Sequence, residues 1–154
     1  MKKSYFRPAV DVMAGYVPGE QPKIDKLIKI NTNENPYPPA PGVFDTLGAF
    51  AADKLRLYPQ PTADIARETI ATLHGVDIDN VIAANGSDDT LNIAIRSFCG
   101  PGLPLACFNP SYSLYPVLAQ MQEAPIIRLN LTEGFGMPSD AAEPAAPANL
   151  PLLT

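Results

Sequence analysis

The chain has 154 residues, with 11 Lys and Arg against 16 Asp and Glu, which gives a formal net charge of −5. Hydrophobic residues make up 46% and charged residues 18%, which is typical of a globular protein and not of a disordered chain. No apolar run approaches the roughly 20 residues of a membrane helix. The basic start, Met-Lys-Lys, is followed by polar sequence, so we expect neither a secretory signal nor a membrane partner.

The charge is unevenly distributed along the chain. Residues 1–30 carry six Lys and Arg and three acids, whereas residues 31–154 carry five and thirteen. A nucleic-acid-binding protein needs a basic face across its body. The acidic body therefore argues against a nucleic-acid partner.

The cysteines and the only histidine indicate neither a metal site nor nucleophilic catalysis. Cys99 and Cys107 lie in apolar contexts without metal-ligand spacing, which is typical of reduced, buried thiols in a cytoplasmic protein. His74 directly precedes Gly75 at the expected end of a helix, where capping explains it. We expect a cytoplasmic protein without a metal.

Prolines divide the chain into an arm and a body. Eighteen prolines are present, and seven of them lie within the first 41 residues. Each removes a backbone donor and restricts the preceding residue, so the region has no room for a long helix. We predict an N-terminal arm over 1–41, with at most a short strand over 27–30, and a body over 42–154.

The body alternates between helical and strand-like patterns. Apolar spacing predicts helices over about 42–53, 62–74 with Thr62 as N-cap and Gly75 after the end, 87–98 with Ser87 as N-cap, and 111–122. Short apolar runs predict strands over 81–84, 103–108 and 125–131, and the tail over 139–153 suggests one more helix and strand, although Pro147 and Pro151 oppose this. Uncharged strands alternating with helices predict an α/β fold with a parallel sheet.

In such sheets, ligands bind beyond the carboxyl ends of the strands, which directs attention to 85–89 and 109–115. The segment Asn85-Gly86-Ser87-Asp88-Asp89 joins a predicted strand to a helix start, where free N–H groups and the helix dipole favour a phosphate. The same residues also make an ordinary helix cap. In the second segment, Tyr112 could stack on a planar ligand, or it could pack on the sheet with Tyr115.

Four segments in this order resemble histidinol-phosphate aminotransferases, which are pyridoxal-phosphate (PLP) enzymes with the aspartate-aminotransferase fold. They are Ile30-Asn31-Thr32-Asn33-Glu34-Asn35-Pro36-Tyr37-Pro38-Pro39, Leu57-Tyr58-Pro59, Asn85-Gly86-Ser87-Asp88-Asp89 and Asn109-Pro110-Ser111-Tyr112-Ser113-Leu114-Tyr115. Tyr16-Val17-Pro18-Gly19-Glu20 fits the family's start. The resemblance covers about residues 8–143 but only the first part of the family's length, so we expect an incomplete PLP-binding domain.

The resemblance implies roles for individual residues. Gly86 and the amides of Ser87 and Asp88 would hold the cofactor phosphate, with Asp89 facing the same site. Tyr112 would stack on the pyridine ring, and Tyr58 would reach across a homodimer interface to the phosphate of the neighbouring cofactor. Tyr16 and Asn33 would line the substrate pocket. The implied reaction moves an amino group between histidinol phosphate and 2-oxoglutarate.

Two further interpretations remain open at this stage. The family's Schiff-base lysine has no counterpart among the lysines of this sequence, so we expect the 154 residues alone to be inactive, with no catalytic residue among them.

The first of the two open interpretations is a different enzyme of the same fold. Another aminotransferase or a threonine-phosphate decarboxylase would share most of these motifs. A chain of a different class, which binds a phosphorylated ligand or pairs with another subunit without catalysis, is the second interpretation.

Overall fold

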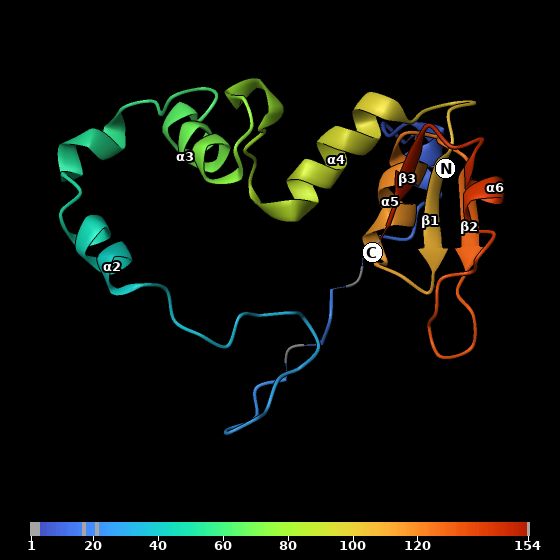
Figure 1. The fold of residues 1–154 in the computed structure, drawn as a ribbon, viewed down its shortest axis with the longest axis horizontal. Coiled ribbons are helices and arrows are strands. Elements are labelled where there is room, and N and C mark those ends of the chain that lie inside the picture. Colours follow the sequence, from blue (N-terminus) through green and yellow to red (C-terminus); the bar gives the residue numbers. More distant parts are fainter. Residues whose placement is uncertain (1–3, 17, 21, 154) are drawn as a thin grey trace. The chain divides into compact units, whose positions relative to one another are not determined.

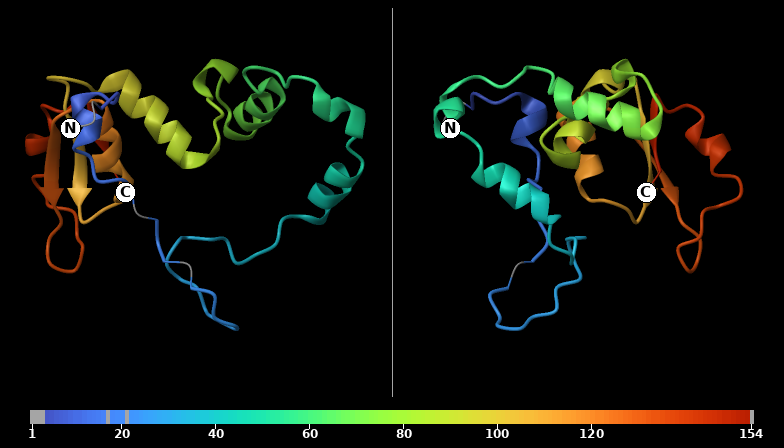
Figure 2. Two further views of the ribbon diagram at one scale, coloured as in Figure 1. Left: turned by 180° about the vertical axis from the view of Figure 1, so that it is seen from behind. Right: turned by 60° about the vertical axis from the view of Figure 1, so that its left-hand side comes forward.

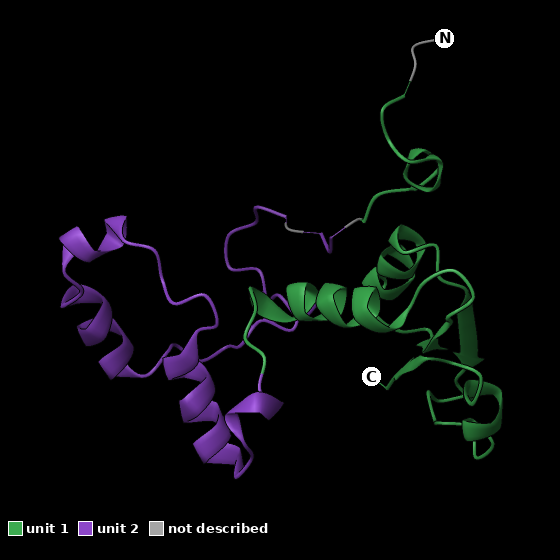
Figure 3. Ribbon diagram, turned by 90° about the horizontal axis from the view of Figure 1, so that it is seen from above, with its two compact units in different colours: residues 1–16, 82–154 green, residues 17–81 purple. Residues whose placement is uncertain are grey.

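The computed structural model describes residues 4–16, 18–20 and 22–153 of the chain. Val17, within the motif that begins at Tyr16, lies outside the described residues. Contacts divide the chain into two units, Met1–Tyr16 with Ile82–Thr154 and Val17–Val81 (Figure 3). Each unit is described by itself below.

The first unit is built on a parallel sheet of three strands in the order β2-β1-β3. β1 (Leu105–Asn109) lies in the centre and pairs with β2 (Ile126–Asn130) and β3 (Leu150–Leu152), and all the pairings are parallel (Figure 1). Helices connect and cover the strands. The predicted α/β class with a parallel sheet is therefore confirmed.

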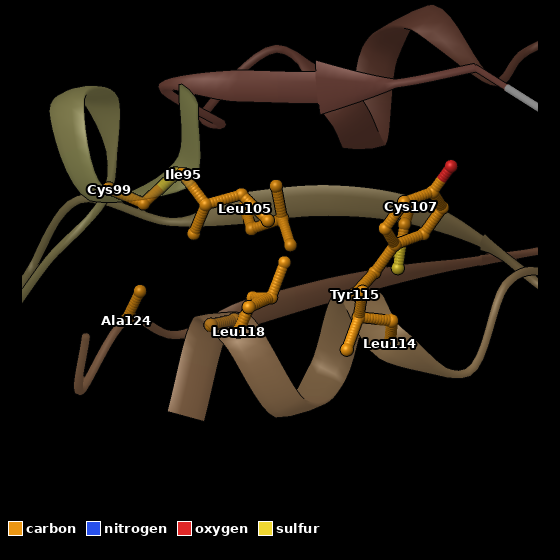
Figure 4. Packing of buried hydrophobic residues seen from close by; sticks show 9 residues of the cluster. Ile95, Cys99, Leu105, Cys107, Leu114, Tyr115, Leu118 and Ala124 are labelled. Carbon is orange, nitrogen blue, oxygen red and sulfur yellow. The ribbon is translucent and has the colours of Figure 1, made fainter. Parts of the chain in front are cut away.

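The two faces of β1 pack against different helices. Leu105 and Cys107 point to one face, where they join a buried cluster with residues of α4 (Gly86–Phe98) and α5 (Leu114–Met121) (Figure 4). Successive strand residues point to opposite faces. Ala106 and Phe108 therefore face the other side, where a cavity is also lined by residues of the short helix α6 (Ala142–Ala145).

The core of this unit is small but well buried. Ile95 of α4 and Leu105 of β1 are the largest fully buried side chains among the described residues. Burying one such side chain contributes about 1.5–3 kcal/mol to folding. The centre of β1, with a partner strand on each side, is therefore the part of this unit most firmly held.

Hydrogen exchange measured by mass spectrometry provides a test of this core. We expect the amides of β1 to exchange most slowly, because both neighbouring strands must separate before they open. Amides over 22–40, where no helix or strand forms, should exchange fastest. Equal protection of these two regions would contradict the packing described here.

The second unit contains helices and irregular segments. Its elements are α2 (Pro41–Gly48), the 3-10 helix η1 (Ala52–Arg56), α3 (Asp64–His74) and the 3-10 helix η2 (Ile78–Asn80). α3 ends at Gly75, whose φ of +66° is the left-handed conformation expected after a helix. This prediction is confirmed. The N-cap of α3 is Ala63 and not Thr62, so that detail was wrong.

Three other predicted elements differ from the structure. The helix over 42–53 was wrong in length, because α2 ends at Gly48 and η1 follows as a separate turn. No strand forms over 27–30 or 81–84. Near the second of these segments, the Arg67 side chain donates from Nε to the Val81 carbonyl at 2.7 Å and from Nη2 to the Ile78 carbonyl at 2.8 Å. A side chain thus takes the carbonyl of Val81 that a strand would use for pairing.

The tail forms the expected helix and strand, both in short form. α6 has four residues and β3 has three. Pro151 in β3 pairs with Ala106, and β3 lies at the edge of the described sheet, where proline is tolerated.

In the described part of the chain, we find no helix with the length and apolar character needed to cross a bilayer.

Candidate functional site

The start of α4 offers backbone donors to an anion. α4 begins at Gly86, whose φ is +81°, and a Cβ atom at this position would meet nothing within 4 Å. A positive φ favours glycine, and the open space leaves the turn accessible to a ligand. The N–H groups of Ser87 and Asp88 belong to the first turn, where no helix carbonyl lies one turn earlier to accept them.

The two acidic side chains of this turn are engaged by partners on the protein. The Asp89 carboxylate accepts a hydrogen bond from the backbone N–H of Asn85 at 3.1 Å, and the Asp88 carboxylate accepts one from the Tyr112 hydroxyl at 2.9 Å. These bonds fix the position of both carboxylates at the start of α4.

The predicted role of Ser87 as N-cap is wrong. The N-cap of α4 is Asn85, and no side-chain capping bond is formed there. Ser87 is the second residue of the helix, and its hydroxyl has no hydrogen-bond partner among the described residues. The Ser87 backbone N–H is therefore one of the free donors of this first turn.

Tyr112 stands between β1 and α5 and reaches the start of α4. α5 begins at Leu114, so the predicted start at 111 was wrong and Tyr112 lies in the connecting loop. Its hydroxyl lies 3.4 Å from that of Tyr16, and the two rings meet edge to face with centroids 6.2 Å apart. Tyr115 packs edge to face on Tyr112 but is buried, whereas 37% of Tyr112 is exposed. Tyr115 is therefore a core residue, and Tyr112 retains surface that a ligand can contact.

The surroundings of Tyr112 oppose ionisation of its phenol. Hydrogen bonding with Tyr16 and then with Asp88 raises the pKa of Tyr112 above the ordinary value, and burial and the charge of Asp88 add to this. A neutral phenol is thus fixed against a carboxylate. The arrangement holds the Tyr112 ring in place without making its hydroxyl an acid or a base at neutral pH.

The raised pKa of Tyr112 predicts a loss of stability in alkaline solution. An unperturbed tyrosine has a pKa of about 10. Because folding raises this value, the stabilisation is present below pH 10 and is lost progressively as the pH rises above it. We expect the unfolding free energy of the parent to fall relative to that of Tyr112→Phe in this range, measured by urea titration. If the unfolding free energies of the two proteins change with pH in parallel, the pKa of Tyr112 is not raised by folding.

Two predicted site residues lie in the other unit. Asn33 adopts a positive φ of 51°, and Tyr58 is fully exposed. Both residues belong to the unit Val17–Val81, whereas Asp88 and Tyr112 belong to the first unit. The structure thus brings together Gly86, Ser87, Asp88, Asp89, Tyr112 and Tyr16, all in the first unit.

The sequence did not indicate the contact between the Asp88 side chain and Tyr112. The rule for parallel sheets directed attention to both segments, but it gives no pairing between side chains. The same holds for Asn109 and Asn130 at the ends of β1 and β2, whose side-chain amides form a hydrogen bond of 3.1 Å. Their register as strand partners becomes visible only once the strands are paired.

Comparison with known proteins identifies the family. The model of class I and II aminotransferases matches residues 25–149. The chain belongs to this family. It is 47% identical over 131 residues to a histidinol-phosphate aminotransferase of Citrifermentans bemidjiense, covering 84% of this chain and 37% of the relative.

Two further relatives carry the same name. The histidinol-phosphate aminotransferase of Chromohalobacter salexigens is 43% identical over 137 residues, or 89% of this chain and 39% of the relative. That of Synechocystis is 43% identical over 143 residues, or 92% and 40%. The predicted resemblance to histidinol-phosphate aminotransferases is thus confirmed, and the chain spans about two fifths of the length of these relatives.

Proposed function

We propose that this chain belongs to a PLP-dependent aminotransferase that exchanges an amino group between histidinol phosphate and 2-oxoglutarate. The observation that carries the proposal is the junction of the α4 N-terminus with Tyr112, in a chain whose relatives bear the name histidinol-phosphate aminotransferase. A free thiol at each of the buried residues Cys99 and Cys107 is consistent with a reducing, cytoplasmic location.

The residues at this junction fit the PLP phosphate and ring. The first-turn amides of Ser87 and Asp88 would bind the phosphate at the positive end of a 13-residue helix. The accessible turn at Gly86 leaves room for close approach. Tyr112, anchored by Asp88 at 2.9 Å, would present its ring to the pyridine. PLP, when bound, supplies the electron sink of the reaction.

The acidic side chains of this turn are held by donors of the protein. A phosphate would be repelled by two free carboxylates beside its amide donors. Here the carboxylate of Asp89 is bonded to the Asn85 amide and that of Asp88 to Tyr112. The phosphate would thus be bound by backbone and dipole, while the acids hold the loop and the ring.

We also propose a homodimer with two composite sites. Tyr58 is a large aromatic side chain that is fully exposed in the described chain. Soluble homo-oligomers are most often twofold symmetric dimers, in which each subunit can complete the other's site. Tyr58 would reach the cofactor phosphate of the partner subunit, and Asn33 and Tyr16 would line the substrate pocket.

An assay of the full-length protein loaded with PLP tests the proposed reaction. We expect transfer of the amino group from histidinol phosphate to 2-oxoglutarate, with phenylalanine and threonine phosphate as competing substrates in the same assay. Transfer from phenylalanine alone would indicate an aromatic aminotransferase, and release of carbon dioxide from threonine phosphate would indicate a decarboxylase. Retention of phosphorylated ligands without any turnover would favour the non-catalytic alternative.

A further inference from the structure

The N-terminal segment is attached to the carboxyl end of α5 by one arginine. Arg7 donates from Nη2 to the Met121 carbonyl at 2.6 Å and from Nη1 to the Glu123 carboxylate at 3.1 Å. Met121 is the last residue of α5. Helix carbonyls at this end lack partners within the helix, and the helix dipole favours a cation there. Arg7 therefore satisfies an open carbonyl and an acidic side chain at the same time.

From Arg7 the segment follows α5 toward its other end. α1 (Pro8–Asp11) packs against α5, and its blue ribbon lies next to α5 in Figure 1 and in the left panel of Figure 2. The segment then reaches Tyr16, whose hydroxyl and ring contact Tyr112. Tyr112 stands two residues before the first residue of α5. The ten residues from Arg7 to Tyr16 thus connect the two ends of one helix.

The segment from Arg7 to Tyr16 is attached to the rest of the unit by three kinds of contact, which differ in strength. α1 has only four residues and none of them is buried, so its packing removes little apolar surface from water. The hydrogen bond between Tyr16 and Tyr112 is long, at 3.4 Å, and exposed. One such bond cannot offset the conformational entropy lost in ordering ten residues. The two bonds of Arg7 are also exposed, but they are shorter and one partner is charged, so they are the strongest polar attachment of the segment to the end of α5.

We propose that Arg7 is a positioning residue that holds Tyr16 against Tyr112 through the segment that follows α5. This inference rests on the proposed function for its consequence, because Tyr16 would line the substrate pocket. Arg7 contacts Met121 and Glu123 at the carboxyl end of α5 and none of the residues proposed for the site. Its loss would release Tyr16 and weaken substrate binding from the far end of α5.

The structural part of this proposal is tested without any ligand. In the full-length protein with labelled tyrosine rings, we expect a nuclear Overhauser effect between Tyr16 and Tyr112 in the parent. Arg7→Met should abolish this signal. Arg7→Lys should retain part of it, because lysine can still donate to the Met121 carbonyl but lacks the two-pronged geometry. Arg56→Met is the matched control, since Arg56 has no ion pair or hydrogen bond by its side chain within the described chain.

The outcomes separate positioning from general stability. Hydrogen exchange of the β1 amides in the same samples reports whether the fold persists. An undiminished ring signal in Arg7→Met would overturn the proposal. If Arg7→Met does not fold, Glu123→Gln decides, because it weakens one of the two bonds of Arg7. A reduced ring signal in that variant supports the proposal, and an unchanged one overturns it.

Binding of histidinol phosphate tests the functional part. We expect Tyr16→Phe and Arg7→Met each to raise Kd roughly 2–10-fold, the range for the loss of one hydrogen bond. The double variant should be no weaker than Tyr16→Phe, since both changes remove the same contact. Additive losses would overturn the proposal. Absence of binding to the parent, with the ring signal still dependent on Arg7, would instead contradict the proposed function.

Discussion

Replacing Ser87 by proline is expected to weaken PLP binding by about 10–100-fold while α4 stays folded. The substitution deletes one backbone N–H at the start of the helix, and a hydrogen bond to a charged group contributes about 1.5–3 kcal/mol. Proline is tolerated in the first helical turn, where its missing donor has no helix partner. Ser87 is the second residue of α4, so the helix itself should lose little. PLP affinity by fluorescence titration and Tm by calorimetry measure the two effects.

Ser87→Ala is the matched control for this change. The Ser87 hydroxyl makes no capping bond, so alanine removes no contact of the described chain and keeps the N–H. We expect PLP affinity and Tm close to those of the parent. If Ser87→Pro retains PLP as well as Ser87→Ala does, the turn is only a helix start and the phosphate binds elsewhere.

Local chemistry made part of the fold predictable from the sequence. The glycine at 75 ended α3 as expected, because few other residues adopt a positive φ without cost. The short, uncharged apolar runs around 105 and 126 form strands, as their local composition predicted. Among the described residues before Pro41, the dense prolines left room for a single helix of four residues. These features depend on nearby residues alone.

The elements that were wrong depend on distant partners. Val81–Ala84 has the composition of a strand, but no strand of the described chain pairs with it, and Arg67 takes the Val81 carbonyl. Thr62 is a good capping residue by type, yet its hydroxyl bonds to the Asp64 side chain and Ala63 takes the N-cap position. Residue type alone cannot show which of two local hydrogen bonds a chain will form.

Part of the candidate site was predicted from local sequence, and part depends on contacts between distant residues. The sheet rule directed attention to 85–89 and 109–115, and the structure joins these segments through Asp88 and Tyr112, although the strand expected before 85–89 does not form. The attachment of Tyr16 depends on a path that begins at Arg7 and passes along α5. Nothing in the local sequence around Arg7 indicates a partner more than a hundred residues away, so only the folded chain reveals it.

Tyr58→Phe is expected to weaken PLP retention by about 10–100-fold in the full-length dimer, if its hydroxyl donates to the cofactor phosphate. Tyr58 is fully exposed and lies between η1 and α3, outside both elements. Phenylalanine keeps the ring and removes only the hydroxyl. The unfolding free energy should therefore change by only a few tenths of a kcal/mol, as for other surface substitutions. Unchanged PLP retention would exclude a phosphate contact.

Mixing two variants that each weaken PLP binding tests whether Tyr58 acts on the partner subunit. In a heterodimer of Tyr58→Phe with Ser87→Pro, a contact across the interface leaves one site with both substitutions and the other with neither. Random pairing then restores PLP binding in about a quarter of all sites. If Tyr58 serves its own subunit, every site of the mixture carries one substitution and nothing is restored. The two variants are mixed, unfolded and refolded together, and the refolded sample is titrated with PLP. Its PLP binding is compared with that of each variant refolded alone.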